Sequence, residues 1–223
     1  DHTDWLGNDI ESIAAEKAGI MRRNSPIVFG GEHPPNAIIR RAKELDSPLL
    51  VSGHDFHADE DAASGTWRWR GHDGEAVAVN WPNLPIPSLM LGNVTASLQA
   101  LKLLPLSLGV EPVAAALSGL GLAGRFDKRR DLGNGRAIIL DVAHNPDAMR
   151  QLSISLHSYI SQNQGAGRIA AVLAVMSDKD VMGMITALEY CVDIWYIAQV
   201  DEGRAMAADE VAQTMKSMGI AYD

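Results

Sequence analysis

The stretch Ile139 to Pro146, ILDVAHNP, decides the fold that we predict for this chain. Its apolar beginning is typical of a buried strand, and the proline at its end opens a helix. Asp141 and His144 lie between the two, at the carboxyl end of the predicted strand. Because ligands bind at this edge of parallel α/β sheets, both are candidate site residues. The alternative is that Asp141 caps the turn and His144 is an ordinary loop histidine.

The sequence on both sides of this stretch alternates predicted strands with predicted helices. Strands are expected at 136–142, 168–176 and 193–199, and helices at 146–162, 180–191 and 207–217. Strands separated by helices of this length imply right-handed crossovers and a parallel sheet. We therefore predict an α/β fold that ends in a Rossmann-like domain with a mainly parallel sheet.

The first half of the chain also begins with alternating strands and a helix, and it continues with a hairpin and two helices. The patterns predict a βαβ unit with strands at 26–30 and 48–52 and a helix at 34–45. A hairpin is predicted at 66–70 and 75–80. Two helices are predicted at 93–108, interrupted by Pro105, and at 112–120. Trp67 and Trp69 have period-two spacing, which predicts packing on one face of the hairpin; stacking on a base or pterin ring is the alternative. The glycine-rich segment 121–126, GLAGRF, suits a hinge, so we predict domains at 1–123 and 124–223.

The first twenty residues, DHTDWLGNDIESIAAEKAGI, contain a predicted helix with an unusual lysine. Asn8 or Asp9 can cap the helix, and Ile10, Ile13, Ala14 and Ala18 form an apolar stripe beside Lys17. Such a lysine ordinarily snorkels to water or pairs with a neighbouring carboxylate. The alternative is a partly buried amine that loses its charge and reacts with carbon dioxide, giving a carbamate that can bind a metal.

Composition restricts the classes of function. The chain has 223 residues, 47% of them hydrophobic, and a net charge of −9, which argues against a nucleic-acid surface. Its dense basic cluster at 128–130, KRR, is expected in a solvated or nucleotide-facing loop. The single cysteine, Cys191, excludes a disulfide scaffold and is expected to be a core thiol, a reactive thiol being the alternative. No apolar run approaches the length of a membrane span, so we expect no membrane contact and a cytoplasmic location.

The motifs DHTDWLG, EKAGI, GRF and DVAHNP together resemble the folylpolyglutamate synthases and the bacterial bifunctional dihydrofolate synthase/folylpolyglutamate synthases. These belong to the ATP-dependent Mur-ligase-like superfamily. The resemblance implies that residues 1–123 are the remainder of a central ATPase domain and that 124–223 are a C-terminal glutamate ligase domain. It also implies an enzyme, an acid–amino-acid ligase.

The same resemblance assigns roles to individual residues. It implies that His2 is a magnesium ligand and that Lys17 is the carbamylated, metal-binding and catalytic lysine. It further implies that Asn93, Arg125 and Asp141 contact ATP. His144, close to Asp141, is a catalytic candidate with an open role; Lys179, in an SDKD segment at a strand end, and Arg204 are weaker candidates.

The activity implied is ATP- and Mg²⁺-dependent addition of L-glutamate to a folate through an acyl phosphate. The expected substrates are tetrahydrofolate and dihydropteroate, and a monomer is expected. The chain has no G-x-x-x-x-G-K-[ST] phosphate loop, so we expect a fragment that is inactive alone. Two other interpretations stay open: another Mur-type amino-acid ligase, such as a peptidoglycan-precursor or cyanophycin enzyme, or a non-catalytic nucleotide-binding module.

Overall fold

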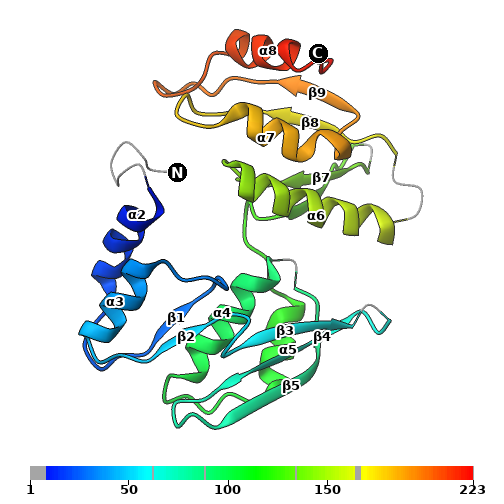
Figure 1. Cartoon of the computed structure of the whole chain (residues 1–223). Coiled ribbons are helices and arrows are strands. Elements are labelled where there is room, and N and C mark those ends of the chain that lie inside the picture. Colours follow the sequence, from blue (N-terminus) through cyan, green and yellow to red (C-terminus); the bar gives the residue numbers. More distant parts are fainter. Residues whose placement is uncertain (1–8, 62, 88, 134, 164–166, 223) are drawn as a thin grey trace. The chain divides into compact units, whose positions relative to one another are not determined.

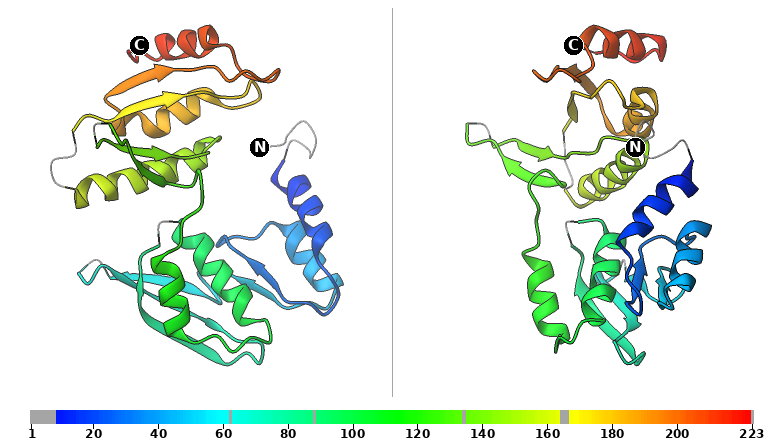
Figure 2. Two further views of the ribbon diagram at one scale, coloured as in Figure 1. Left: turned by 180° about the vertical axis from the view of Figure 1, so that it is seen from behind. Right: turned by 90° about the vertical axis from the view of Figure 1, so that its left-hand side faces the viewer.

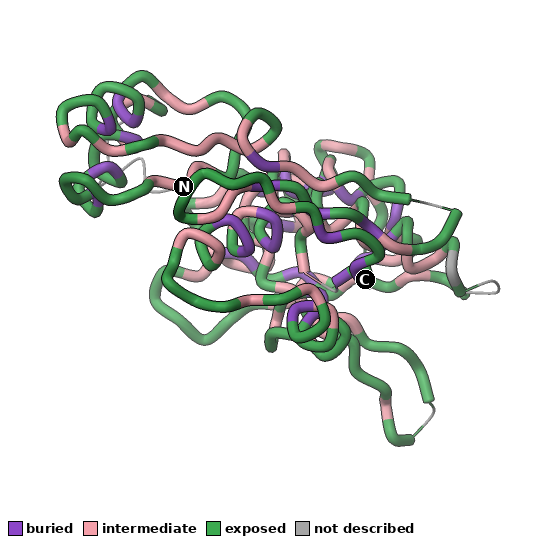
Figure 3. Tube along the Cα trace, turned by 90° about the horizontal axis from the view of Figure 1, so that it is seen from below, coloured by how far each residue is buried: buried purple, intermediate pink, exposed green. Residues whose placement is uncertain are grey.

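The computed structural model describes residues 9–61, 63–87, 89–133, 135–163 and 167–222. The chain divides between Gly121 and Leu122 into two compact units, which we call the N-terminal and C-terminal units and describe separately. His2, expected to bind magnesium, lies outside the described residues. Figure 3 shows the buried positions as short segments flanked by exposed ones, as expected where an element buries one face.

The N-terminal unit begins with a helix packed on a small βαβ motif. Its first elements are α2 (Ile10–Lys17), η1 (Ala18–Ile20), β1 (Ile27–Phe29), α3 (Asn36–Glu44) and β2 (Leu49–Val51). The predicted βαβ unit is confirmed, because β1 and β2 pair in parallel. Asp9 caps α2 through Ser12 N at 2.8 Å, and the Glu11 carboxylate accepts the backbone N–H groups of Asn36 and Ala37, both at 2.8 Å. One acidic side chain therefore joins α2 to the start of α3.

A three-stranded antiparallel sheet and two helices complete this unit (Figure 1). They are β3 (His57–Asp61), β4 (Thr66–His72), β5 (Ala78–Pro85), α4 (Leu91–Lys102) and α5 (Val110–Ser118). The hairpin and the packing role of Trp67 and Trp69 are confirmed, since both indoles are buried against Leu98 and Val113. Their indole N–H groups donate to the carbonyls of Pro85 and Thr95 at 2.9 and 3.2 Å.

Two details of the sequence interpretation are wrong here. The helix predicted at 93–108 begins at Leu91 and ends at Lys102, because the approach to Pro105 disfavours helical backbone. Strand β3 was not predicted at all: its sequence HADED has no apolar alternation, yet it pairs with β4 along its whole length.

The buried amide of Gln99 fastens α4 to the sheet. Its Nε2 donates to the His72 carbonyl at 2.7 Å, and its Oε1 accepts the His72 N–H at 3.0 Å. The side chain is completely buried. Gly71 makes this possible, because a Cβ there would collide with Gln99 Oε1 and the Trp69 ring.

The C-terminal unit confirms the predicted α/β fold. Its elements are β6 (Asp127–Arg130), β7 (Ala137–Leu140), α6 (Pro146–Gln162), β8 (Ala170–Leu173), α7 (Val181–Leu188), η2 (Glu189–Cys191), β9 (Ile194–Ile197) and α8 (Ala208–Ser217). The strands form two separate two-stranded sheets and not one mainly parallel sheet: β8 pairs β9 in parallel, and β6 pairs β7 antiparallel. The cluster 128–130 therefore lies in strand β6 and not in a loop.

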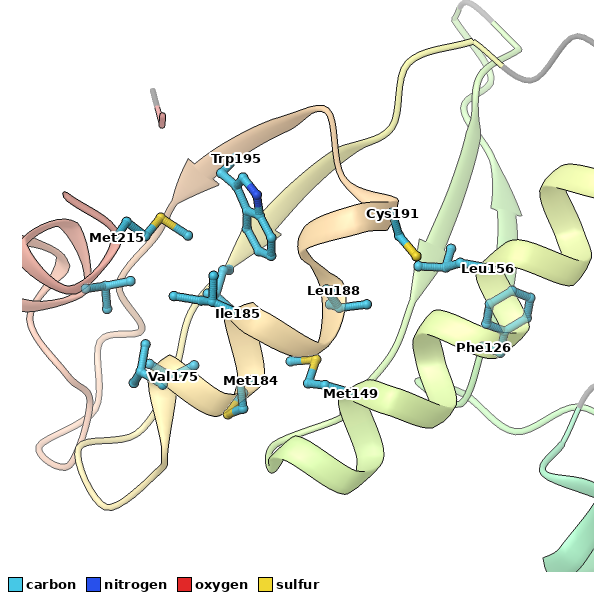
Figure 4. Close-up of a cluster of buried hydrophobic side chains, with 13 residues drawn as sticks. Phe126, Met149, Leu156, Val175, Met184, Ile185, Leu188, Cys191, Trp195 and Met215 are labelled. Atoms are coloured by element: carbon cyan, nitrogen blue, oxygen red, sulfur yellow. The ribbon is translucent and has the colours of Figure 1, made fainter. Parts of the chain in front are cut away.

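The core of the C-terminal unit is rich in aliphatic and methionine side chains (Figure 4). Met149 and Leu156 of α6 meet Ile185 and Leu188 of α7, and the two helices lie side by side (Figure 2). Cys191 is buried, as predicted for a core thiol, and its sulfur lies 3.2 Å from His157 Nδ1 and 3.0 Å from Ser153 Oγ. Over the described ranges, no helix is both long and apolar enough to span a membrane.

Candidate nucleotide site at the end of strand β7

Asp141 immediately follows β7 and is tied to two different parts of the C-terminal unit. Its Oδ2 accepts the backbone N–H of Phe126 at 2.7 Å, and its Oδ1 accepts the N–H of Ala143 at 2.8 Å. The side chain is half-buried. A carboxylate has about four lone-pair positions, so these two bonds leave acceptor capacity for a ligand hydroxyl. The capping and ligand interpretations of Asp141 are thus compatible.

The segment Gly124 to Phe126 lies against the end of β7. The Gly124 carbonyl accepts the Val142 N–H at 2.8 Å. Gly124 has φ of +70°, and a Cβ there would lie 2.9 Å from Val142 Cγ1, so both conformation and space favour glycine. Phe126 also has positive φ, +45°, which is uncommon for a residue with a side chain.

Arg125 and His144 both present exposed side chains in this unit. Arg125 is held through its backbone, whose N–H donates to the Leu122 carbonyl at 3.0 Å. His144 places its Nδ1 3.0 Å from the Val142 carbonyl. Asn145 then caps α6 by accepting the Ala148 N–H at 2.8 Å. The guanidinium suits a phosphate oxygen, and the start of α6 favours negative charge.

The loop after β8 contributes a second polar turn to the C-terminal unit. Asp180 caps α7 through the Gly183 N–H at 2.9 Å, and Lys179 Nζ lies 2.7 Å from Asp178 Oδ2. The hydrogen bond from Lys179 lowers the pKa of Asp178 below its ordinary value of 3.8, and the charge of Arg204 adds to this effect. The Arg204 carbonyl accepts the Ser177 N–H at 2.9 Å.

The two polar turns of the C-terminal unit lie near one another. A Cβ on Gly183, at the start of α7, would lie 2.8 Å from Pro146 Cγ, at the start of α6. The turn 141–146, with Asp141 and His144, and the turn 177–183, with Lys179, therefore share one region at the starts of these helices. This places charged groups of both signs within one domain, as binding of a nucleotide or an amino acid requires.

Lys17 and Asn93 belong to the N-terminal unit and are both exposed. Asn93 is in the first turn of α4, where its Nδ2 lies 3.8 Å from Met90 Sδ. The expectation that Lys17 is partly buried is wrong for the described residues, because α2 packs through Ala14 and Ala18. Ile10, expected in the apolar stripe, is 73% exposed. In the described part of the chain, no three His, Cys, Asp or Glu side chains gather as a metal site.

Comparison with known proteins identifies the family. Residues 124–222 match the family described as Mur ligase, glutamate ligase domain. The Haemophilus influenzae dihydrofolate synthase/folylpolyglutamate synthase is 31% identical over 97% of this chain and 51% of its own length. Residues 124–222 of this chain belong to the Mur ligase family as a glutamate ligase domain.

Solved structures extend the similarity over the whole chain. Escherichia coli FolC in complex with DHPP and ADP has 30% identity and a TM-score of 0.83, covering 100% of this chain and 50% of that one. A bifunctional folylpolyglutamate synthase/dihydrofolate synthase with Mn, AMPPNP and L-glutamate bound has 33% identity and a TM-score of 0.82, with coverage of 100% and 50%. The chain therefore spans about half the length of the Mur ligase relatives that it matches.

Two contacts of the structure were not found from the sequence. The N–H of Phe126 binds Asp141, and no residue pattern signals the positive φ that directs it there. Glu11, in the first turn of α2, also caps α3. The sequence contained a signal for the Glu11 contact: Pro35, which precedes α3, has no side-chain group that could cap the helix.

Proposed function

We propose that this chain is part of an ATP-dependent ligase that adds L-glutamate to folates and also joins glutamate to dihydropteroate. The main support is similarity at 30% identity or more, across the whole chain, to proteins whose structures hold ADP with DHPP, or AMPPNP with L-glutamate. The motifs DVAHNP and GRF support the same proposal, because the structure brings Asp141 and the Arg125 segment together. The alternative, a different Mur-type ligase, would share these features.

In this proposal the C-terminal unit binds the nucleotide through complementary groups. Asp141 accepts hydrogen bonds from ribose hydroxyls with the lone pairs that its backbone contacts leave, and Arg125 binds a phosphate oxygen. Asn93, in the N-terminal unit, pairs with the adenine edge through its amide. His144 lies in the same turn as Asp141, where it can contact the nucleotide or the incoming amino acid. Excluding water from this region protects the acyl phosphate from hydrolysis.

The proposed cofactors are ATP and Mg²⁺, with Lys17 as a carbamate and His2 as metal ligands. A magnesium ion neutralises charge on a transferring phosphoryl group. The described residues alone do not fit such an ion, because they bring no three ligands together and leave Lys17 exposed. We therefore assign the metal no step in this chain. A monomeric, cytoplasmic protein completes the proposal, and size-exclusion chromatography with light scattering tests the first part.

The decisive experiment assays the whole gene product that contains this chain. ATP-, Mg²⁺- and glutamate-dependent ligation is measured with tetrahydrofolate and with dihydropteroate. We expect turnover of both, abolished by Lys17→Ala and partly restored by a short carboxylate that replaces the carbamate. Arg23→Ala, which removes a cation that pairs with exposed Asp46, is the control. A folded product that ignores both folates but ligates another acid would refute the assignment.

A further inference from the structure

Asp141 holds the Arg125 segment in place as well as facing a ligand. We infer that it is a positioning residue: it latches the segment 124–126 to the end of β7, so that Arg125 is presented by the C-terminal unit as part of one rigid element. This inference rests on the proposed function for the role of Arg125. It goes beyond the ribose contact, because it makes Asp141 act through another residue.

Two backbone hydrogen bonds, one on each side of Arg125, support the inference. The Phe126 N–H donates to Asp141 Oδ2 at 2.7 Å, and the Val142 N–H donates to the Gly124 carbonyl at 2.8 Å. Arg125 lies between these two fixed points. Hydrogen bonds to an ionised acceptor are stronger than neutral ones, so the carboxylate contact is the main fastening. It also supports the positive φ of Phe126, a conformation that is otherwise disfavoured.

The side chain of Phe126 fastens the same segment to the core. It is 9% exposed and makes an edge-on contact with Tyr159 of α6, with ring centroids 6.3 Å apart. The Lys128 ammonium lies 5.5 Å from the Phe126 ring and 5.4 Å from the Tyr159 ring, within cation–π range. Figure 4 shows Phe126 beside α6, near Leu156. Arg125 is thus followed directly by a residue anchored in the C-terminal core.

The chain just before this segment, at Gly121 and Leu122, is exposed. Around Gly121, a Cβ would meet no atom within 4 Å, and Leu122 is 54% exposed. The two compact units also divide between these two residues. A bend at the division between Gly121 and Leu122 therefore leaves Arg125 and Asp141 on the same side of it. The hydrogen bonds that hold residues 124–126 are those of a rigid segment and not of a hinge.

Amide hydrogen exchange on the 223-residue chain without nucleotide tests the latch itself. In Asp141→Asn only one amide oxygen remains as an acceptor, so one of the two backbone donors faces an NH₂ group. We expect exchange at Phe126 or Ala143 to rise by about tenfold or more, with no change in α8. Asp147→Asn, which removes an exposed carboxylate that pairs with Arg150, is the matched control. Unchanged protection of both amides would overturn the latch. If Asp141→Asn does not fold, Gly124→Ala disturbs the segment from its other side, with the same expected rise at Phe126.

A double-mutant cycle tests whether Asp141 acts through Arg125. ATP affinity of the whole gene product that contains this chain is measured by calorimetry for the wild type, Arg125→Ala, Asp141→Asn and the double variant. A positioning role predicts that the loss caused by Arg125→Ala is several-fold smaller in the Asp141→Asn background. Fold losses that simply multiply would mean that Asp141 acts only as a ligand and would overturn the positioning role. A wild-type gene product that does not bind ATP, with the exchange result intact, would count against the proposed function and leave the latch established.

Discussion

Gln99 in the N-terminal unit and Asp141 in the C-terminal unit make the same kind of contact in different surroundings. Each side chain binds two backbone groups: Gln99 takes the N–H and carbonyl of His72, and Asp141 takes the N–H groups of Phe126 and Ala143. Gln99 is neutral and completely buried, whereas Asp141 is half-buried and acidic.

This difference separates a scaffold contact from a candidate site. A completely buried neutral amide presents no group to solvent that a ligand could reach, and it contributes chiefly to stability. A half-buried carboxylate keeps free lone pairs and access to solvent, which is what recognition of ligand hydroxyl groups requires. Substitution of Gln99 should therefore affect folding most, and substitution of Asp141 should affect binding most.

The largest effect is expected for Gln99→Ala. It leaves the His72 N–H and carbonyl buried without partners, which should lower the free energy of unfolding of the N-terminal unit by about 3 kcal/mol. Urea unfolding followed by near-ultraviolet circular dichroism of the buried tryptophans measures this change. Gln151→Ala, at an exposed position of α6, is the control and should change stability by less than about 0.5 kcal/mol. A loss of similar size in both variants would mean that the Gln99 contact is not a scaffold element.

Gly71→Ala tests the same contact from the strand side. The added Cβ would collide with Gln99 Oε1 and the Trp69 ring, so we expect a loss of about 1–3 kcal/mol. Gly92→Ala makes the identical change in α4, where a Cβ meets nothing within 4 Å. There the change should stabilise the helix by about 0.5–1 kcal/mol. Thermal unfolding of both variants measures these changes. Melting temperatures that shift in the same direction would contradict this account.

The sequence predicted the elements that have a periodic apolar pattern. The βαβ unit at 26–52 and the hairpin follow from apolar runs and alternation; both are confirmed, although the second hairpin strand is Ala78–Pro85 and not 75–80. The charged strands β3 and β6, HADED and DKRR, have no such pattern, since their neighbours decide their pairing. Propensity cannot reveal strands of this kind.

The candidate site was predicted as a set of residues and not as an arrangement. Asp141, Arg125 and His144 were selected from motifs in neighbouring segments, but the sequence did not connect Asp141 with Phe126. That contact depends on a positive φ at a phenylalanine, which only the surrounding packing can impose. Likewise, the exposure of Lys17 depends on which face of α2 packs. That face contains Ala14 and Ala18, and it is narrower than the predicted apolar stripe.

Asp141→Ala should cost less stability than Gln99→Ala. Both backbone donors lose their acceptor, but the site is half-exposed and water can replace part of the contact, so we expect a loss of about 1–2 kcal/mol. Amide hydrogen exchange in α7 and α8 reports unfolding of the C-terminal unit. A loss greater than that of Gln99→Ala would show that Asp141 is primarily a scaffold residue.

The smallest effect concerns Asp127 and depends on pH. The hydrogen bond from Arg129, assisted by the Gly124 N–H at 3.4 Å, lowers the pKa of Asp127 below its ordinary value of 3.8. The folded state therefore favours the ionised form, and this contribution to stability is complete above the unfolded-state pKa and is lost as the pH falls through the folded-state pKa.

Unfolding of wild type and Asp127→Asn between pH 7 and pH 2.5 tests this sign. The stability difference should be constant above about pH 5 and should shrink below the ordinary carboxyl pKa. The deficit of Gln99→Ala should not follow this profile, because an amide does not titrate in the range. A deficit of Asp127→Asn that grows on acidification would reverse the assignment. A deficit that stays constant down to pH 2.5, like that of Gln99→Ala, would mean that charge does not distinguish the carboxylate contact beside Gly124 from the neutral contact.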